Sequence, residues 1–240
     1  MRSLPSRRPD WLTARPFAHR GRHGGGVAEN SRAAFEAAVA AGHGIELDVQ
    51  ASRCGAAFVF HDDRLDRLTG ESGPVAGRDA DELRRIRLNG SEETIPPLDE
   101  ILALVAGRAP VLIEVKPSRA SRRALCENVA ASLDLYSGPA AAMSFDPGVG
   151  AWFERHRPEV VRGLVVSAQD KTRARGWAER AWSAWRARPD FIACDVRDLP
   201  SAFADRQRAL GRPILTWTCR SEEERARAAR WADQIIYETA

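Results

Sequence analysis

The feature that most limits the fold of this chain is an alternation of short apolar runs with longer amphipathic stretches, from residue 15 onward. The runs have the length and composition of β-strands, and helix-length segments lie between most of them. One such segment begins at Asn30-Ser31, a suitable helix N-cap, and is followed by Gly42. Apolar strands that alternate with helices indicate a parallel sheet covered by helices. The expected strands are residues 16–20, 44–49, 57–61, 111–116, 141–145, 162–166, 191–195, 214–218 and 234–238.

Nine expected strands are one more than an eight-stranded barrel needs, and the spacing of two of them explains the excess. Only seven residues separate strand 44–49 from strand 57–61, whereas a parallel partner requires a crossover of about a dozen residues or more. Strand 57–61 should therefore return antiparallel, as a hairpin that turns at Arg53-Cys54-Gly55. The remaining eight strands predict an α/β protein with a TIM-type (β/α)8 barrel and one hairpin excursion. In that hairpin His61 falls opposite Asp48, give or take one residue.

The length of the chain, 240 residues, suits a single barrel domain that covers residues 1–240. Residues 64–97 interrupt the alternation, because they are polar, contain four glycines and end in Pro96-Pro97. This segment is too long for a plain loop. We interpret it as a small insertion that lies over the barrel mouth.

Composition excludes several classes of protein. Hydrophobic residues make up 44% of the chain and charged residues 29%, as in ordinary soluble globular proteins. No apolar run is long enough for an integral membrane segment, and residues 1–15 lack the apolar core of a secretory signal, so a cytoplasmic protein is expected. The net charge is only +3, and nothing resembles a nucleic-acid-binding motif. The arginines near the start could favour an anionic membrane surface or nucleic acid, but a solvated basic tail is the preferred interpretation. The four scattered cysteines form no CxxC pair and are expected to be buried free thiols.

Three carboxylates are candidates for a metal site. Glu46 and Asp48 are separated by one residue, so on a strand they point to the same face. Buried against a helix layer they would repel each other at high cost, whereas at the barrel mouth they can share a cation. Glu114 repeats the pattern on the next parallel strand, and carboxylates without paired cysteines favour Mg2+ or Ca2+ over zinc. The alternative is a structural ion network in which Lys116 and Arg20 neutralise the acids, but three acids at adjacent strand ends favour the metal.

Two histidines are expected beside these acids, because His19 ends the first strand and His61 ends the hairpin. Hydrolysis of a phosphodiester needs a base for the attacking oxygen and an acid for the leaving alkoxide, and imidazole serves as either near neutral pH. Arg20 and Lys116 would add positive charge where negative charge develops on the phosphate. Lys116 is one of only two lysines in a chain whose other basic side chains are arginines, which indicates a site that requires a compact charge.

Several short motifs follow one another in a fixed order between residues 15 and 238, most densely before Pro117. They are His19-Arg20-Gly21, Glu29-Asn30-Ser31 with Ala33-Ala34-Phe35, Ile45-Glu46-Leu47-Asp48-Val49, His61-Asp62-Asp63-Arg64-Leu65-Asp66-Arg67-Leu68-Thr69-Gly70, Ile95-Pro96-Pro97-Leu98, Ile113-Glu114-Val115-Lys116-Pro117, Ser144-Phe145 and Trp217-Thr218. Each motif alone is weak, but their ordered combination resembles the glycerophosphodiester phosphodiesterase family.

The resemblance implies a phosphoric diester hydrolase that cleaves a small-molecule glycerophosphodiester to glycerol 3-phosphate and an alcohol. The attacking group is either water or a neighbouring glycerol hydroxyl, and either histidine could be the acid. The resemblance implies that Glu46, Asp48 and Glu114 hold one divalent cation, Mg2+ or Ca2+. It implies that His19 and His61 are the acid–base pair. It also implies that Arg20 and Lys116 contact the phosphate and that Trp217 lies against the glycerol.

The chain departs from the family pattern at three places. Ala28 stands where the family usually has proline, Cys54-Gly55 where it has Asp-Gly, and Tyr237-Glu238 where it has Thr-Asp. We expect these changes to affect the choice of substrate more than the reaction.

Two other functions are alternatives to this one. A lysophospholipase D-like enzyme that acts on lipid head groups would need an apolar entry for an acyl chain, and the sequence indicates no exposed apolar helix. A catalytically silent barrel that binds phosphorylated polyols would be favoured by the loss of a key histidine or carboxylate, and none is missing.

Overall fold

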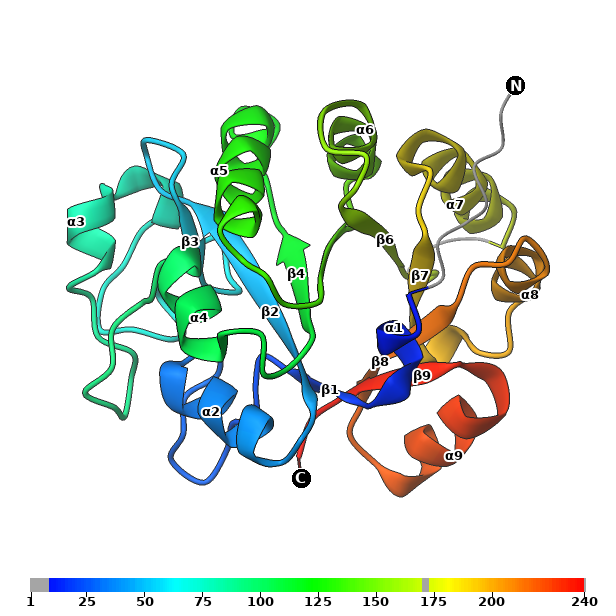
Figure 1. Cartoon of the computed structure of the whole chain (residues 1–240), viewed down its shortest axis with the longest axis horizontal. Helices are drawn as coiled ribbons and strands as arrows, with labels where there is room; N and C mark the ends of the chain where they lie inside the picture. The colour runs from blue at the N-terminus through cyan, green and yellow to red at the C-terminus, as the bar shows by residue number, and fades with distance from the viewer. Residues whose placement is uncertain (1–8, 170–172, 240) are drawn as a thin grey trace. The chain divides into compact units, whose positions relative to one another are not determined.

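The structure is a computed structural model that describes residues 9–169 and 173–239 (Figure 1). It divides into two compact units: the first comprises residues 17–140 with 238–239, and the second residues 9–16 with 141–237. The strands of the described chain are β1 Phe17–His19, β2 Gly44–Ala51, β3 Ala57–Val59, β4 Val111–Val115, β5 Ala140–Ser144, β6 Val161–Val166, β7 Phe191–Asp195, β8 Ile214–Cys219 and β9 Gln234–Tyr237. Its helices are α1 Trp11–Ala14, α2 Arg32–Ala40, η1 Val75–Gly77, α3 Ala80–Leu83, α4 Leu98–Val105, α5 Arg122–Asp134, α6 Pro147–His156, α7 Arg173–Ala187, η2 Val196–Asp198, α8 Ala202–Ala209 and α9 Glu222–Trp231.

All nine expected strands are present, and their ends differ from the expected ones by at most two residues. The helix expected after Asn30 is α2, and the Ser31 side chain caps it by accepting a hydrogen bond from the Ala34 backbone N–H. The helix ends where Gly42 takes a φ of 72°, a left-handed conformation that glycine adopts without strain. The expectation of one domain over residues 1–240 stays a prediction.

In the first unit, β1 and β4 both pair parallel with β2, and β3 pairs with it antiparallel. The hairpin prediction is therefore confirmed. The Phe60 backbone N–H donates to the Asp48 carbonyl over 3.0 Å, so Phe60 rather than His61 stands opposite Asp48. His61 is thus one residue away from the position opposite Asp48, which agrees with the expectation because that allowed for one residue.

The segment 64–97 contains η1 and α3, joined by isolated bridges such as Arg64 with Pro74 and Thr69 with Leu88. It is stabilised by an apolar cluster of its own that also includes two residues of the hairpin. The buried members are Phe58, Phe60, Leu65, Val75, Leu83, Ile86, Leu88 and Ile95. The expected small insertion is therefore an ordered, packed segment, and its place over a barrel mouth stays a prediction.

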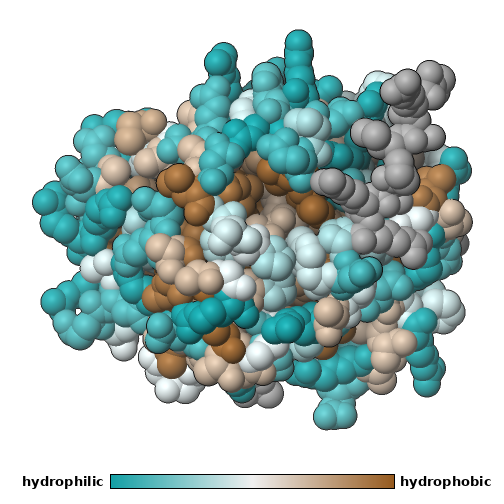
Figure 2. Space-filling view, viewed as in Figure 1, coloured by the Kyte–Doolittle hydropathy of each residue, from teal (hydrophilic) through white to brown (hydrophobic). Residues whose placement is uncertain are grey.

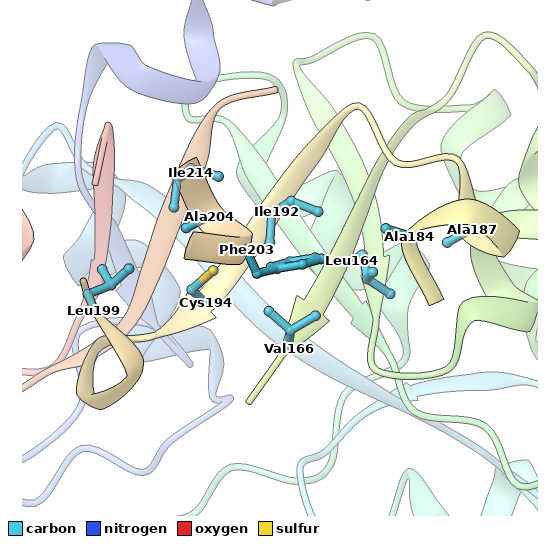
Figure 3. Close-up of a cluster of buried hydrophobic side chains, with 10 residues drawn as sticks. All are labelled: Leu164, Val166, Ala184, Ala187, Ile192, Cys194, Leu199, Phe203, Ala204 and Ile214. Atoms are coloured by element: carbon cyan, nitrogen blue, oxygen red, sulfur yellow. The ribbon is translucent and has the colours of Figure 1, made fainter. Parts of the chain in front are cut away.

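In the second unit, strands β5 to β9 pair in sequence order and are all parallel. Helices α7 and α8 pack against β6, β7 and β8 through a cluster of buried side chains that surrounds Phe203 (Figure 3). Alanines of α7, such as Ala184 and Ala187, allow the helix to approach the sheet closely. This cluster fixes both helices on the outer face of the three strands.

One sequence-based expectation needs correction. Cys54 is exposed at the hairpin turn and is not a buried thiol, although Cys126, Cys194 and Cys219 are buried as expected. Arg2, Arg7 and Arg8 lie outside the described residues, so the interpretation of the arginines near the start as a solvated tail stays a prediction.

On the face drawn in Figure 2, hydrophilic residues cover most of the surface and hydrophobic residues form small separate patches. Within the described residues, no helix has the length and hydrophobicity that crossing a bilayer requires.

The sheet of the second unit has room for only a hydrogen atom at Gly163 of β6. A Cβ there would lie 2.3 Å from Cζ of Phe191 and 2.7 Å from Cβ of Met143, on the two neighbouring strands. We expect Gly163→Ala to lower the free energy of unfolding by about 1–3 kcal/mol through overpacking. Urea denaturation measures this value.

Gly70→Ala is the matched control, because a Cβ at Gly70 has no heavy atom within 4 Å. The added variant Phe191→Leu should restore part of the lost stability in the Gly163→Ala background by making room. If Gly163→Ala and Gly70→Ala unfold at the same urea concentration, the proposed clash is not present.

Candidate active site

Three carboxylates converge in the first unit, as the sequence predicts. Glu46 and Asp48 lie on β2, and Glu114 of β4 is the register partner of Asp48. Each offers an oxygen atom, and these atoms all lie within 4.8 Å of one another. The three side chains belong to residues that are 1%, 1% and 8% exposed, respectively. Glu114 therefore faces the other two acids and not a helix layer.

The charges around these acids are unevenly compensated. Burial works against ionisation of Asp48, but Lys116 and Arg20 outweigh it and hold the pKa of Asp48 at about 2. Burial raises the pKa of Glu46 well above its ordinary value, and the charges of Asp48 and Glu114 add to this effect. Burial also raises the pKa of Glu114 to about 7. The protein itself thus disfavours the ionised form of Glu46 and Glu114, in contrast to Asp48.

The cationic partners lie mainly against Asp48. Lys116 Nζ is 3.1 Å from Asp48 Oδ1 and 3.4 Å from Glu114 Oε1, and Arg20 Nε is 3.3 Å from Asp48 Oδ2. Among the described residues, Glu46 accepts only the Arg20 backbone N–H, over 3.1 Å. An ion network of Lys116 and Arg20 therefore accounts for Asp48 and part of Glu114, but leaves Glu46 without a side-chain cation in contact.

The residues present fit a divalent cation. Their donors are hard carboxylate oxygens, which Mg2+ and Ca2+ prefer. A cation would also offset the like-charge repulsion that raises the pKa of Glu46. Glu46, Asp48 and Glu114 are the residues that could hold it.

His19 is the last residue of β1, and its ring contacts Glu238, which follows β9. Its Nδ1 is 2.6 Å from Oε1 of Glu238, and its Nε2 is 3.9 Å from Oε2 of Glu46. Burial lowers the pKa of His19 despite the Glu238 hydrogen bond, so the ring is neutral near pH 7. Because a carboxylate only accepts, Nδ1 carries the proton and the Nε2 lone pair is directed toward the acids.

His61 is held in the same manner by its neighbour in sequence. Its Nδ1 is 2.5 Å from Oδ1 of Asp62, and burial lowers the pKa of His61. Arg67 donates two hydrogen bonds to the Asp62 carboxylate, of 2.7 and 2.8 Å. Asp62 is thereby fixed as the acceptor that orients the imidazole.

Glu29 connects the two sides of the site. Its carboxylate accepts from Arg67 over 2.9 and 3.0 Å and from Arg20 over 2.7 Å. A continuous chain of contacts thus runs from His61 through Asp62, Arg67 and Glu29 to Arg20. If His61 or Arg20 moved, the charged hydrogen bonds that join Asp62, Arg67 and Glu29 would break.

Sequence reasoning did not assign roles to these supporting residues. Glu29, Asp62 and Arg67 stand inside the motifs quoted above, so the motifs themselves were the available signal. Asn30 also belongs here, because its side-chain amide donates to Asp48 Oδ2 over 3.0 Å. Glu238 was noted only as a departure from the family pattern, and its contact with His19 spans 219 positions.

Trp217, the expected glycerol contact, lies in the second unit on β8. Its indole N–H donates to the Ala193 carbonyl over 3.0 Å, and its ring meets that of Phe145 edge to face at 5.5 Å. The indole is therefore well anchored. A role in binding glycerol stays a prediction.

Solved structures similar to this chain show its fold. A phosphodiesterase from Oleispira antarctica, in complex with the product sn-glycerol-3-phosphate, is 22% identical with a TM-score of 0.82; the match covers 95% of this chain and 93% of that one. A glycerophosphodiester phosphodiesterase from Thermotoga maritima is 23% identical with a TM-score of 0.73, covering 92% of each chain. The fold is a TIM-type barrel of eight parallel strands, with β3 as the extra strand, as expected from the sequence.

Curated relatives point to the same family. A probable glycerophosphodiester phosphodiesterase of Mycobacterium tuberculosis is 30% identical over 210 residues, which are 83% of this chain and 71% of that protein. A glycerophosphodiester phosphodiesterase of Bacillus altitudinis is 42% identical over 107 residues, but this match spans only 42% of this chain and 43% of the relative.

The sequence model of the glycerophosphoryl diester phosphodiesterase family matches residues 19–237. That range includes both histidines, all three converging carboxylates, Lys116 and Trp217. The expectation drawn from the ordered motifs is confirmed: this chain belongs to the glycerophosphoryl diester phosphodiesterase family.

Proposed function

We propose that this chain hydrolyses glycerophosphodiesters to glycerol 3-phosphate and an alcohol, with the help of one divalent cation. The observation that carries the proposal is the convergence of Glu46, Asp48 and Glu114 beside two carboxylate-held histidines, His19 and His61. Family membership supports the class of reaction. The Oleispira antarctica relative, solved with the product sn-glycerol-3-phosphate, supports the class of substrate.

Glu46, Asp48 and Glu114 would hold Mg2+ or Ca2+, which when bound neutralises a non-bridging phosphate oxygen. Lys116 lies 3.1 Å from Asp48, so its ammonium can turn toward a phosphate oxygen without leaving the carboxylates. Arg20 is held by Glu29 and can donate its remaining N–H groups to the same phosphate. These side chains position the diester and stabilise the charge that builds on it.

The histidines move the protons. One Nε2 atom accepts the proton of the attacking oxygen, which belongs to water or to the neighbouring glycerol hydroxyl, as the new P–O bond forms. The other ring, which is protonated at Nε2 as well and is therefore an imidazolium, delivers that Nε2 proton to the leaving alkoxide as the old P–O bond breaks. Asp62 and Glu238 keep each ring in one orientation throughout, because each accepts from an Nδ1.

The first prediction concerns the reaction and its metal. Purified protein should release glycerol 3-phosphate from glycerophosphocholine or glycerophosphoethanolamine when Mg2+ or Ca2+ is present, and EDTA should abolish the release. Glu46→Gln should lower kcat by on the order of 100-fold or more, because it removes a charged ligand. A coupled glycerol 3-phosphate assay measures both effects.

Glu92→Gln is the control, because Glu92 is an exposed acid paired with Arg87 and lies outside the carboxylate cluster. Its activity should match that of the unchanged chain. Turnover that continues undiminished in EDTA would refute the metal assignment. A folded, metal-loaded protein that cleaves no diester would favour a barrel that only binds phosphorylated polyols.

The second prediction concerns the acid–base pair. His19→Ala and His61→Ala should each lower kcat by about 100- to 10,000-fold, the usual contribution of a positioned proton-transfer group. His156→Ala, in the exposed C-terminal turn of α6, should leave kcat unchanged. Steady-state kinetics together with a circular dichroism spectrum of each variant separates loss of chemistry from loss of fold. Near-normal kcat in either active-site variant would remove that histidine from the mechanism.

The third prediction concerns the carboxylate behind His19. Glu238→Gln preserves the size of the side chain but offers an N–H as well as an oxygen, so His19 is no longer restricted to one tautomer. We expect kcat to fall at least about tenfold, by analogy with other carboxylate–histidine pairs, while KM stays nearly constant. An equal rise in KM with an unchanged kcat would indicate that Glu238 binds substrate instead.

A further inference from the structure

Helix α7 exposes three tryptophans to solvent. Trp177, Trp182 and Trp185 are 47%, 54% and 73% exposed, although tryptophan is ordinarily among the largely buried residues. Positions 177 and 185 share one side of the helix, and position 182 adjoins 185 at a spacing of three. The sequence indicates no exposed apolar helix, and α7 is indeed rich in charged residues, but it exposes these three aromatic rings.

A groove lies between α7 and α8 and is lined by two of these tryptophans, Trp177 and Trp185. Its volume is about 720 Å3, and its apolar walls include Trp177, Trp185, Phe203 and Leu210. Phe203 is only 2% exposed and belongs to the buried cluster that fixes both helices on the sheet (Figure 3). The groove is therefore part of a packed scaffold and is formed before any ligand arrives.

The charged residues of the groove all have the same sign. Arg188, Arg206 and Arg212 line it, and no lining residue is acidic. Arg188 is paired with Glu154 at 2.7 Å. Within the described part of the chain, Arg206 and Arg212 have no carboxylate at ion-pair distance, although Arg212 donates to Gln207 and interacts with the more distant charge of Asp190. The groove thus combines aromatic walls with an excess of positive charge, most freely exposed at Arg206.

This combination of groups favours one kind of occupant. In a two-fold symmetric dimer the same surface faces itself, so the arginines of one copy would oppose those of the other. An anionic bilayer surface has no such conflict. Tryptophan rings settle at the level of the lipid head groups, and arginine binds lipid phosphates while its alkyl stem lies on apolar surface.

We propose that the exposed tryptophans of α7 and the arginine-lined groove between α7 and α8 form a docking surface for an anionic lipid bilayer. Trp182 and Trp185 insert at the head-group level, and Arg206 and Arg212 contact lipid phosphates. Arg186, which lies over the Trp182 ring at 5.8 Å, extends the cationic edge. This contact is peripheral, and it does not depend on the proposed catalytic activity.

The test is binding of the full chain to vesicles, measured by co-sedimentation and by the shift of tryptophan emission. Vesicles of phosphatidylcholine with phosphatidylglycerol should bind the chain at least about tenfold better than phosphatidylcholine alone, and added salt should weaken the binding. Arg206→Glu, and separately the pair Trp182→Ala with Trp185→Ala, should each reduce binding about tenfold or more. These side chains are exposed, so the variants should keep their fold.

Matched controls come from other surfaces of the chain. Arg123→Glu makes the same charge change at an exposed position on α5, and Trp231→Ala removes a tryptophan that is 40% exposed on α9. Neither should affect vesicle binding. Equal losses in the controls and the groove variants would overturn the proposal, because binding would then follow net charge or total tryptophan content alone.

Two further results would assign the surface to another occupant and refute the lipid proposal. One is a dimer, seen by light scattering, that dissociates in the Trp182→Ala, Trp185→Ala variant and does not bind vesicles. The other is binding of an acidic peptide such as polyglutamate, lost in Arg206→Glu, without any binding to vesicles. Phosphodiesterase activity in solution should be equal in all of these variants, which separates this test from that of the proposed reaction.

Discussion

The repulsion among three buried carboxylates is the constraint on which the rest of the first unit depends. Glu46, Asp48 and Glu114 lie within 4.8 Å of one another, and burial removes the water that would otherwise screen them. Lys116 and Arg20 answer part of this charge by direct contact with Asp48. The charge that they leave uncompensated is unfavourable for folding, and the same charge would favour the binding of a cation there.

The need to hold these charges in place explains the hydrogen-bonded side chains that surround them. Arg20 lies against Asp48, and Glu29 fixes its guanidinium there by accepting a hydrogen bond from it. Glu29 in turn accepts from Arg67, which donates to Asp62 behind His61. Arg20 and His61 are therefore oriented by one network, whose charged hydrogen bonds strengthen one another at low dielectric.

Much of this arrangement could be predicted from the sequence because it follows from local periodicity. The spacing of Glu46 and Asp48 places both on one strand face, and the short link before residue 57 requires a hairpin that brings His61 near them. Glu238 could not be placed, because no local pattern links it to a histidine 219 positions away. The exposure of the α7 tryptophans could not be predicted for a different reason. Whether these side chains are buried depends on which neighbouring helix covers them, and the sequence of one helix does not specify its neighbour.

The contact between His19 and Glu238 makes the order of synthesis matter. As the chain leaves the ribosome, His19 emerges early, and its carboxylate partner follows 219 positions later. A nascent chain that has already folded β1, β2 and β4 around the three acids still has an unoriented imidazole. Loss of only the residues after Tyr237 would leave the carboxylate cluster intact but release the His19 ring from the carboxylate that orients it. The carboxylate cluster and the orientation of His19 are therefore completed at different times during synthesis.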